Sequence, residues 1–94
     1  MASLSELKTK EVVSNIRKIR EYRNYTQDYL AAKLGISQNA YSKIELGYSN
    51  ITLNRLIEIS DILEVDLIDL IRHDSATPTH AKLIDGKNFS SGIN

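Results

Sequence analysis

Four polar residues in one short segment have side chains suited to contacting nucleic acid bases: Gln38, Asn39, Ser42 and Lys43. The carboxamides of Gln and Asn can form paired hydrogen bonds with the N6/N7 edge of adenine, and Lys can donate to guanine O6/N7. Their spacing of i, i+1, i+4 and i+5 places them on one face of a helix. Ala40, Tyr41 and Ile44 turn to the other face. The segment therefore predicts a helix with an apolar inner edge and an outer face able to contact bases.

The residues around this segment predict the elements that position it. Thr26 can cap one short helix, about residues 26–34, and Ser37 can cap the next, about residues 38–46. Gly35 lies between them, where glycine accepts a left-handed conformation without steric cost. A turn this tight crosses two helices steeply and exposes the start of the second, as in helix-turn-helix motifs that enter a DNA major groove.

Periodic apolar residues predict three further helices, over about residues 10–22, 53–63 and 67–71. Two start signals compete for the first helix, because Ser3 and Glu6 form a capping-box pattern and Thr9 is also a suitable cap. We place its start near Lys10 and leave an upstream extension open. This part of the sequence shows no strand pattern, so the predicted fold class is all-α with five helices.

Composition excludes several functional classes. The 94 residues suit one small domain, and the absence of cysteine excludes disulfides, thiolate catalysis and cysteine-based zinc sites. No stretch approaches the roughly 20 apolar residues that span a bilayer, and the first residues lack an apolar signal core, so we expect a cytoplasmic protein. His73 and His80 fit no standard metal spacing, and no nucleophile–base set is visible. We therefore expect no enzyme activity, no metal and no cofactor.

The net charge is zero, but the charges are unevenly distributed. Residues 1–47 hold eight Lys or Arg against five Asp or Glu, whereas residues 48–94 hold four against seven. The half that contains the predicted helix-turn-helix is therefore basic, which favours one face turned toward phosphates.

The composition changes after residue 72, where the chain becomes polar and contains Pro78. We therefore divide the chain into an N-terminal arm (residues 1–10), a helical domain (11–72) and a C-terminal tail (73–94). Asp85-Gly86 matches a hairpin signal, but a lone hairpin is marginal in water, and a mostly mobile tail is the preferred interpretation.

Residues 16–71 as a block resemble the Cro/repressor-type helix-turn-helix family, also called the Xre family. The resemblance rests on Gln27 after the cap, Ala31, Gly35, Ile36-Ser37, the run from Ser42 to Gly47, and the apolar stripe of residues 53–63. It implies a five-helix, lambda-repressor-like fold and sequence-specific binding to double-stranded DNA as a homodimer. The chain departs from the family at Ser60, where alanine is common, and at Glu64, where glycine is usual.

The resemblance also assigns roles to individual residues. It implies a phosphate contact and a buttress for the second motif helix at Gln27, and backbone contacts near Tyr48 and Asn50, after that helix. The expected DNA-binding set is Gln27, Ser37, Gln38, Asn39, Ser42, Lys43, Tyr48 and Asn50. Tyr41 stands where the family has an aliphatic residue, so we expect a mostly buried ring whose hydroxyl reaches water or a phosphate.

Two further pairs have structural roles. The family pairs an arginine of the first helix with a glutamate near the end of the third, which implies an ion pair between Arg20 and Glu45. Ile57 and Ile68 fall off the inward stripes of their helices, and exposed branched aliphatics suggest a dimer interface. Single surface isoleucines are also common and need no special explanation.

These features favour a transcriptional regulator, and specifically a repressor that binds a pseudo-palindromic operator as a dimer. The alternative is the antitoxin of a toxin–antitoxin pair, in which the tail would bind the toxin and fold on contact. A sensor that receives a peptide or ligand ranks last, because the chain has no room for a separate ligand domain.

Overall fold

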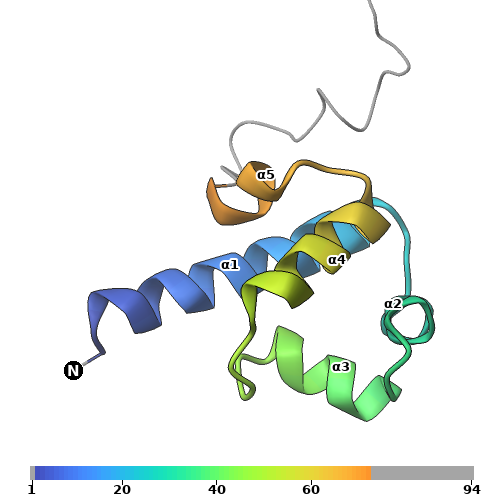
Figure 1. Cartoon of the computed structure of the whole chain (residues 1–94), viewed down its shortest axis with the longest axis horizontal. Helices are drawn as coiled ribbons and strands as arrows, with labels where there is room; N and C mark the ends of the chain where they lie inside the picture. Colours follow the sequence, from blue (N-terminus) through green and yellow to red (C-terminus); the bar gives the residue numbers. More distant parts are fainter. Residues whose placement is uncertain (1, 73–94) are drawn as a thin grey trace, which may run out of the picture.

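The computed structural model describes residues 2–72, which form five helices. These are α1 (Leu4–Tyr22), α2 (Gln27–Leu34), α3 (Gln38–Glu45), α4 (Leu53–Leu63) and α5 (Leu67–Arg72) (Figure 1). No strand occurs among the described residues, and the all-α prediction is confirmed. No helix in residues 2–72 combines the length and apolar character needed to cross a membrane. The predicted tail, with His73, His80 and the Asp85-Gly86 signal, lies outside the described residues.

Helix α1 begins earlier than residue 10. Ser3 accepts a hydrogen bond from the Glu6 backbone N–H at 3.1 Å, and the Glu6 carboxylate accepts from the Ser3 N–H at 2.9 Å. This capping box satisfies backbone donors that a helix start leaves without partners. Thr9 is therefore not a cap, and its hydroxyl donates to the Ser5 carbonyl within the helix. Residues 4–10, assigned above to an arm, are the first turns of α1, and all are exposed.

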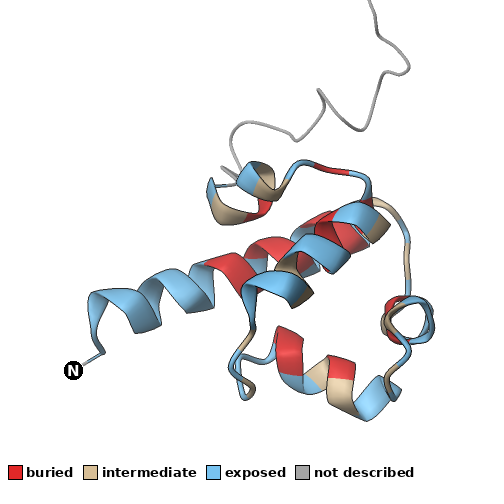
Figure 2. Ribbon diagram, in the orientation of Figure 1, coloured by how far each residue is buried: buried red, intermediate tan, exposed pale blue. Residues whose placement is uncertain are grey.

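The core lies where α1 crosses the other helices, and buried residues line the side of each helix that faces inward (Figure 2). Helix α1 packs on α3, α4 and α5, while α2 packs on α3 and α4. The largest fully buried side chains are Ile16, Ile19, Leu30, Tyr41, Ile59, Leu63 and Leu70. A buried hydrogen bond joins the first and last helices: the Asn15 amide of α1 donates to the Leu70 carbonyl of α5 at 2.7 Å.

The helix ends follow local chemistry except at one position. Gly35 ends α2 in the left-handed conformation with φ +73°, as the sequence predicts. Glu64 ends α4 in the same conformation with φ +61°, although this backbone conformation is strained for a residue that carries a Cβ atom. Arg23, at the end of α1, forms an ion pair with the Glu64 carboxylate at 3.0 Å. An ion pair between residues that are far apart in the sequence therefore stabilises the non-glycine cap of α4.

Candidate nucleic-acid interface

Helices α2 and α3 form the predicted helix-turn-helix, and each begins at its predicted cap. The Thr26 hydroxyl accepts from the Tyr29 N–H, and the Ser37 hydroxyl accepts from the Ala40 N–H, both at 3.0 Å. Between them the Ile36 N–H donates to the Ala31 carbonyl at 3.0 Å, which closes the turn after α2. The two helices pack on each other, so the orientation of α3 is fixed by α2 and by the core.

The outer face of α3 is polar and accessible. Gln38, Asn39 and Lys43 are exposed and Ser42 is half-buried, whereas the inward residues Tyr41, Ile44 and Glu45 are buried. No carboxylate among the described residues pairs with Lys43. The face therefore offers two carboxamides and a free ammonium group, which together can donate to and accept from base edges.

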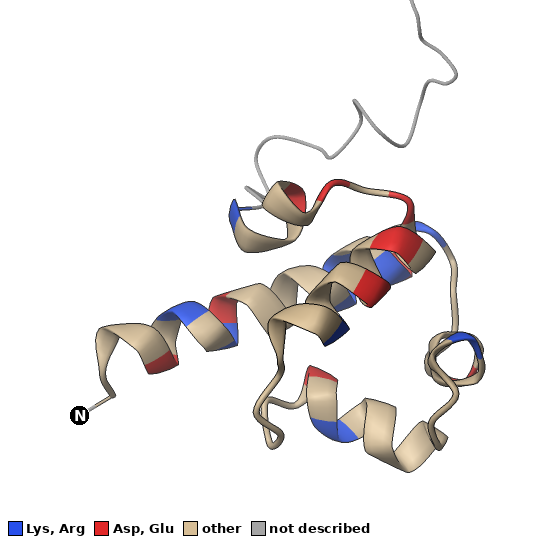
Figure 3. Cartoon of the chain, viewed as in Figure 1, with Lys and Arg blue, Asp and Glu red and all other residues tan. Residues whose placement is uncertain are grey.

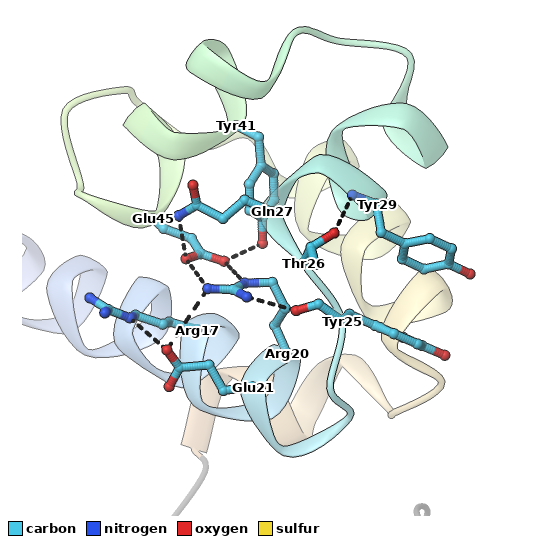
Figure 4. Close-up of polar contacts among 9 residues, drawn as sticks. All are labelled: Arg17, Arg20, Glu21, Tyr25, Thr26, Gln27, Tyr29, Tyr41 and Glu45. Carbon is cyan, nitrogen blue, oxygen red and sulfur yellow. Dashed lines mark hydrogen bonds and ion pairs between the residues drawn. The ribbon is translucent and has the colours of Figure 1, made fainter.

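A buried polar cluster lies behind this face, centred on the Glu45 carboxylate (Figure 4). Arg20 donates to Glu45 through Nε at 2.6 Å and through Nη2 at 3.1 Å, so the structure brings together the pair expected from the sequence. Gln27 Nε2 donates to the same carboxylate at 3.1 Å. Burial alone would raise the pKa of Glu45, but hydrogen bonds from Arg20, Tyr41 and Gln27 outweigh it and lower the pKa.

Tyr41 is buried as the sequence predicts, but its hydroxyl has a different partner from the one expected. Its ring is completely buried, and its hydroxyl donates to Glu45 Oε2 at 2.5 Å rather than reaching water or a phosphate. The reason is local, because residues four apart on a helix lie on the same face. Burial, followed by the hydrogen bond to Glu45, raises the pKa of Tyr41 well above its ordinary value. The i, i+4 spacing of Tyr41 and Glu45 is the sequence signal that could have identified this contact.

Arg20 links the cluster to the start of α2. Besides holding Glu45, its Nη1 donates to the Tyr25 carbonyl at 2.7 Å, in the connection between α1 and α2 (Figure 4). The hydrogen bond to Glu45 raises the pKa of Arg20, against the opposing effect of burial. One guanidinium thus ties α1, the α1–α2 connection and α3 together. The role of the Tyr25 carbonyl has no signature in the sequence.

The remaining candidate residues lie around α3. Ser37 is exposed at the start of α3, with its hydroxyl engaged as the cap. Tyr48 and Asn50 are exposed in the α3–α4 connection, and the Tyr48 N–H donates to the Lys43 carbonyl at 2.9 Å. The loop is therefore anchored to the end of α3. Gln27 lies at the start of α2, partly buried, with its amide turned toward Glu45.

Charges of both signs occur over the domain. The α4–α5 connection and α5 carry acidic residues on the side of the domain away from α3, and α3 carries Lys43 (Figure 3). Ile57 on α4 and Ile68 on α5 are 48% and 52% exposed, so the described part of the chain leaves about half of each residue uncovered. No cluster of three or more potential metal ligands occurs in residues 2–72.

Comparison with known proteins identifies the family. A helix-turn-helix family model matches residues 16–70. A Bacillus subtilis protein named as the uncharacterized HTH-type transcriptional regulator YqaE is 41% identical over 61 residues, or 65% of this chain and 53% of its own length. The uncharacterized HTH-type transcriptional regulator y4dJ of Sinorhizobium fredii is 33% identical over 69 residues, or 73% of this chain and 90% of its own.

A third relative is a phage protein. The cryptic phage CTXphi transcriptional repressor RstR of Vibrio cholerae is 38% identical over 64 residues, or 68% of this chain and 54% of its own length. The chain thus matches about half the length of two of these three relatives. No solved structure gives a significant match. The matched region contains all of α2, α3 and α4, the exposed polar face of α3 and both members of the Arg20–Glu45 pair, and the chain belongs to the Cro/repressor-type (Xre) family of helix-turn-helix transcriptional regulators.

Proposed function

We propose that the chain is a transcriptional repressor that binds a pseudo-palindromic operator as a dimer. The observation that carries this proposal is the division of α3 into a buried edge and an exposed face that bears Gln38, Asn39 and Lys43. The Vibrio cholerae relative is named as a transcriptional repressor, which supports repression as the direction of regulation. Repression would follow from occupying a promoter.

In the proposed complex, α3 of each copy enters a major groove, and the two grooves are about one DNA turn apart, roughly 34 Å between centres. Gln38 and Asn39 stand at the start of α3 and would contact base edges. Gln27, Tyr48 and Asn50 would contact phosphates, which position the domain without reading the sequence. Ser37 and Ser42 are polar residues at the edge of the same surface.

The proposed dimer uses the α4–α5 side of the domain. Ile57 and Ile68 are exposed there, and burial of such residues against a second copy would remove apolar surface from water. Nothing in the regulator and repressor names of the relatives favours the antitoxin alternative, and the tail that it would need lies outside the described residues.

The proposal is tested by selecting bound sequences from a random pool of DNA duplexes and footprinting the protein on the selected sequences. A repressor dimer predicts an inverted repeat whose half-site centres are about 10 base pairs apart. Ile57→Lys and Ile68→Lys should weaken binding to the full site more than binding to one half-site. A selected pool with no sequence in common, or a single site without symmetry, would contradict the proposed operator.

A further inference from the structure

Helix α3 has little packing support, although it carries the candidate base contacts. Among the described helices its backbone approaches only α1 and α2, whereas α1 approaches α3, α4 and α5. Three of the eight residues of α3 are buried, namely Tyr41, Ile44 and Glu45. Two of these three are polar and hydrogen-bonded to each other. The orientation of α3 therefore depends strongly on the contacts of Tyr41 and Glu45.

The Glu45 carboxylate accepts four hydrogen bonds, two at each oxygen. Oε2 accepts from Arg20 Nε at 2.6 Å and from the Tyr41 hydroxyl at 2.5 Å. Oε1 accepts from Arg20 Nη2 and from Gln27 Nε2, both at 3.1 Å. An ionised carboxylate has about four acceptor positions, so this set of donors is complete. The Glu45 side chain is 2% exposed, so water has little access to a position that loses its donor.

Tyr41 supplies the donor that comes from α3 itself, while Arg20 and Gln27 reach Glu45 from α1 and α2 (Figure 4). This difference matters because a glutamate side chain rotates about several bonds. A bond to Arg20 alone would therefore tether α3 through a flexible side chain. The bond from Tyr41, one turn earlier on the same helix, fixes the carboxylate relative to the α3 backbone. The tether to α1 and α2 then becomes a rigid link.

The orientation of the inner edge also sets the outer face, since a short helix moves as one body. Gln38 and Asn39 lie on that exposed face. Base contacts require side chains to be placed within about 0.5 Å and 10–20° of the productive geometry. Contacts to phosphates position a protein on the duplex but carry no sequence information. A loosened α3 should therefore lose sequence preference before it loses general affinity for DNA.

We propose that Tyr41 is a positioning residue for base recognition. Its hydroxyl locks the Glu45 side chain and thereby sets the orientation of α3 relative to Arg20 of α1 and Gln27 of α2. Tyr41 itself contacts no base, because its ring is completely buried. This inference deepens the proposed function and rests on it for the base contacts of α3.

Binding of Tyr41→Phe to a selected operator and to a scrambled duplex of the same composition tests this role. The variant keeps the buried ring and removes one donor from Glu45. Its preference for the operator should fall by roughly tenfold, the equivalent of weakening one good base contact. Its affinity for the scrambled duplex and its salt dependence should match those of the wild type, because no cationic group is lost. An unchanged operator preference would overturn the proposal.

Ile59→Val is the matched control for a loss of stability. Ile59 is fully buried on α4 and makes none of the hydrogen bonds to Glu45, so removal of one methyl group destabilises the fold by a different route. Urea unfolding measures the loss of stability in both variants, and binding is compared where both are fully folded. Ile59→Val should keep the operator preference of the wild type. An equal loss of preference in the two variants would mean that Tyr41 acts through stability alone, which would also overturn the proposal.

Hydrogen exchange of the free protein gives a readout that needs no DNA. In Tyr41→Phe, the backbone amides of residues 41–46 should lose more protection than those of α4, because α3 has lost a local restraint. In Ile59→Val, the amides of α3 should lose no more protection than those of α4. A Tyr41→Phe variant that loses protection equally in both helices would refute the positioning role.

These measurements separate the inference from the proposed function. A wild type that selects no common DNA sequence would count against the proposed repressor. The exchange measurements would still decide whether Tyr41 holds α3 in place, since they do not depend on an operator.

Discussion

Tyr41 and Glu45, one turn apart on α3, share a buried hydrogen bond of 2.5 Å in which the phenol donates to the carboxylate. The same carboxylate accepts from Arg20 of α1 and from Gln27 of α2. The inner edge of the helix that carries the candidate base contacts is therefore fixed by directional bonds as well as by apolar packing. Directional bonds of this kind hold a helix in one orientation, which base recognition requires.

The first prediction concerns acid stability. The folded-state pKa of Glu45 lies below its ordinary value of 4.5, so the unfolded chain binds the proton more readily. Glu45 therefore contributes stability that is present above about pH 4.5 and is lost as the pH falls through the folded-state pKa. Urea unfolding between pH 7 and pH 3 should show this loss. Glu45→Gln should be less stable at pH 7 and show a flatter acid limb, whereas an unchanged limb would contradict the assignment.

The second prediction concerns the coupling of Arg20 and Glu45. Only 10% of the Arg20 side chain and 2% of the Glu45 side chain are exposed, so removal of either partner leaves a largely buried charge. Arg20→Met or Glu45→Gln alone should cost about 3–5 kcal/mol of unfolding free energy. The double variant should cost clearly less than the sum of the two single changes. Strictly additive losses in chemical denaturation would show that the two groups do not stabilise each other.

The third prediction concerns the left-handed cap at Glu64. Glycine at this position should relieve roughly 1 kcal/mol of backbone strain, while losing an ion pair with Arg23 that is worth at most about 1 kcal/mol because the carboxylate is mostly exposed. Glu64→Ala loses the pair and keeps the strain. Glu64→Gly should therefore be the more stable of the two variants, by about 1 kcal/mol in thermal or urea unfolding. Equal stabilities would mean that the cap is not strained.

Local sequence patterns predict much of this fold because the interactions involved are local. Thr26 and Ser37 each cap the helix expected from them, since an N-cap depends on a hydroxyl and an amide three residues away, and Thr52 caps α4 in the same way. The predicted start of α1, near Lys10, is later than the observed start at Leu4. Ser3 and Thr9 are both suitable caps, and local chemistry alone does not choose between them.

Long-range contacts are what the sequence leaves undetermined. Tyr41 was expected to be buried, but the partner of its hydroxyl depends on where α1 places Arg20 against Glu45. The unusual Glu64 is visible in the sequence, whereas its support by Arg23 depends on the packing of α1 against α4. The exposed face of α3 is predicted only in part. Helical spacing predicts which residues share the face, but only the family resemblance gives this face a role.

The final prediction concerns the different roles of α3 and the start of α2. Loss of a bidentate base contact should cost about 1–3 kcal/mol of binding free energy and relax the preference at one base pair. Gln38→Ala and Asn39→Ala should therefore change the selected sequence. Both side chains are exposed, so neither variant should change the unfolding free energy by more than about 0.5 kcal/mol.

Gln27→Ala should behave differently, because its amide bonds to Glu45 and the residue stands where a phosphate contact is proposed. Its affinity should fall alike for all sequences, and the slope of log K against log salt should stay nearly unchanged, because a neutral carboxamide displaces no counterion from DNA. Its thermal stability should fall as well, since Glu45 loses one of its donors. Binding of each variant to operator variants at two salt concentrations distinguishes the two roles. A Gln38/Asn39 double variant that keeps both full affinity and the original sequence preference would remove α3 from base recognition.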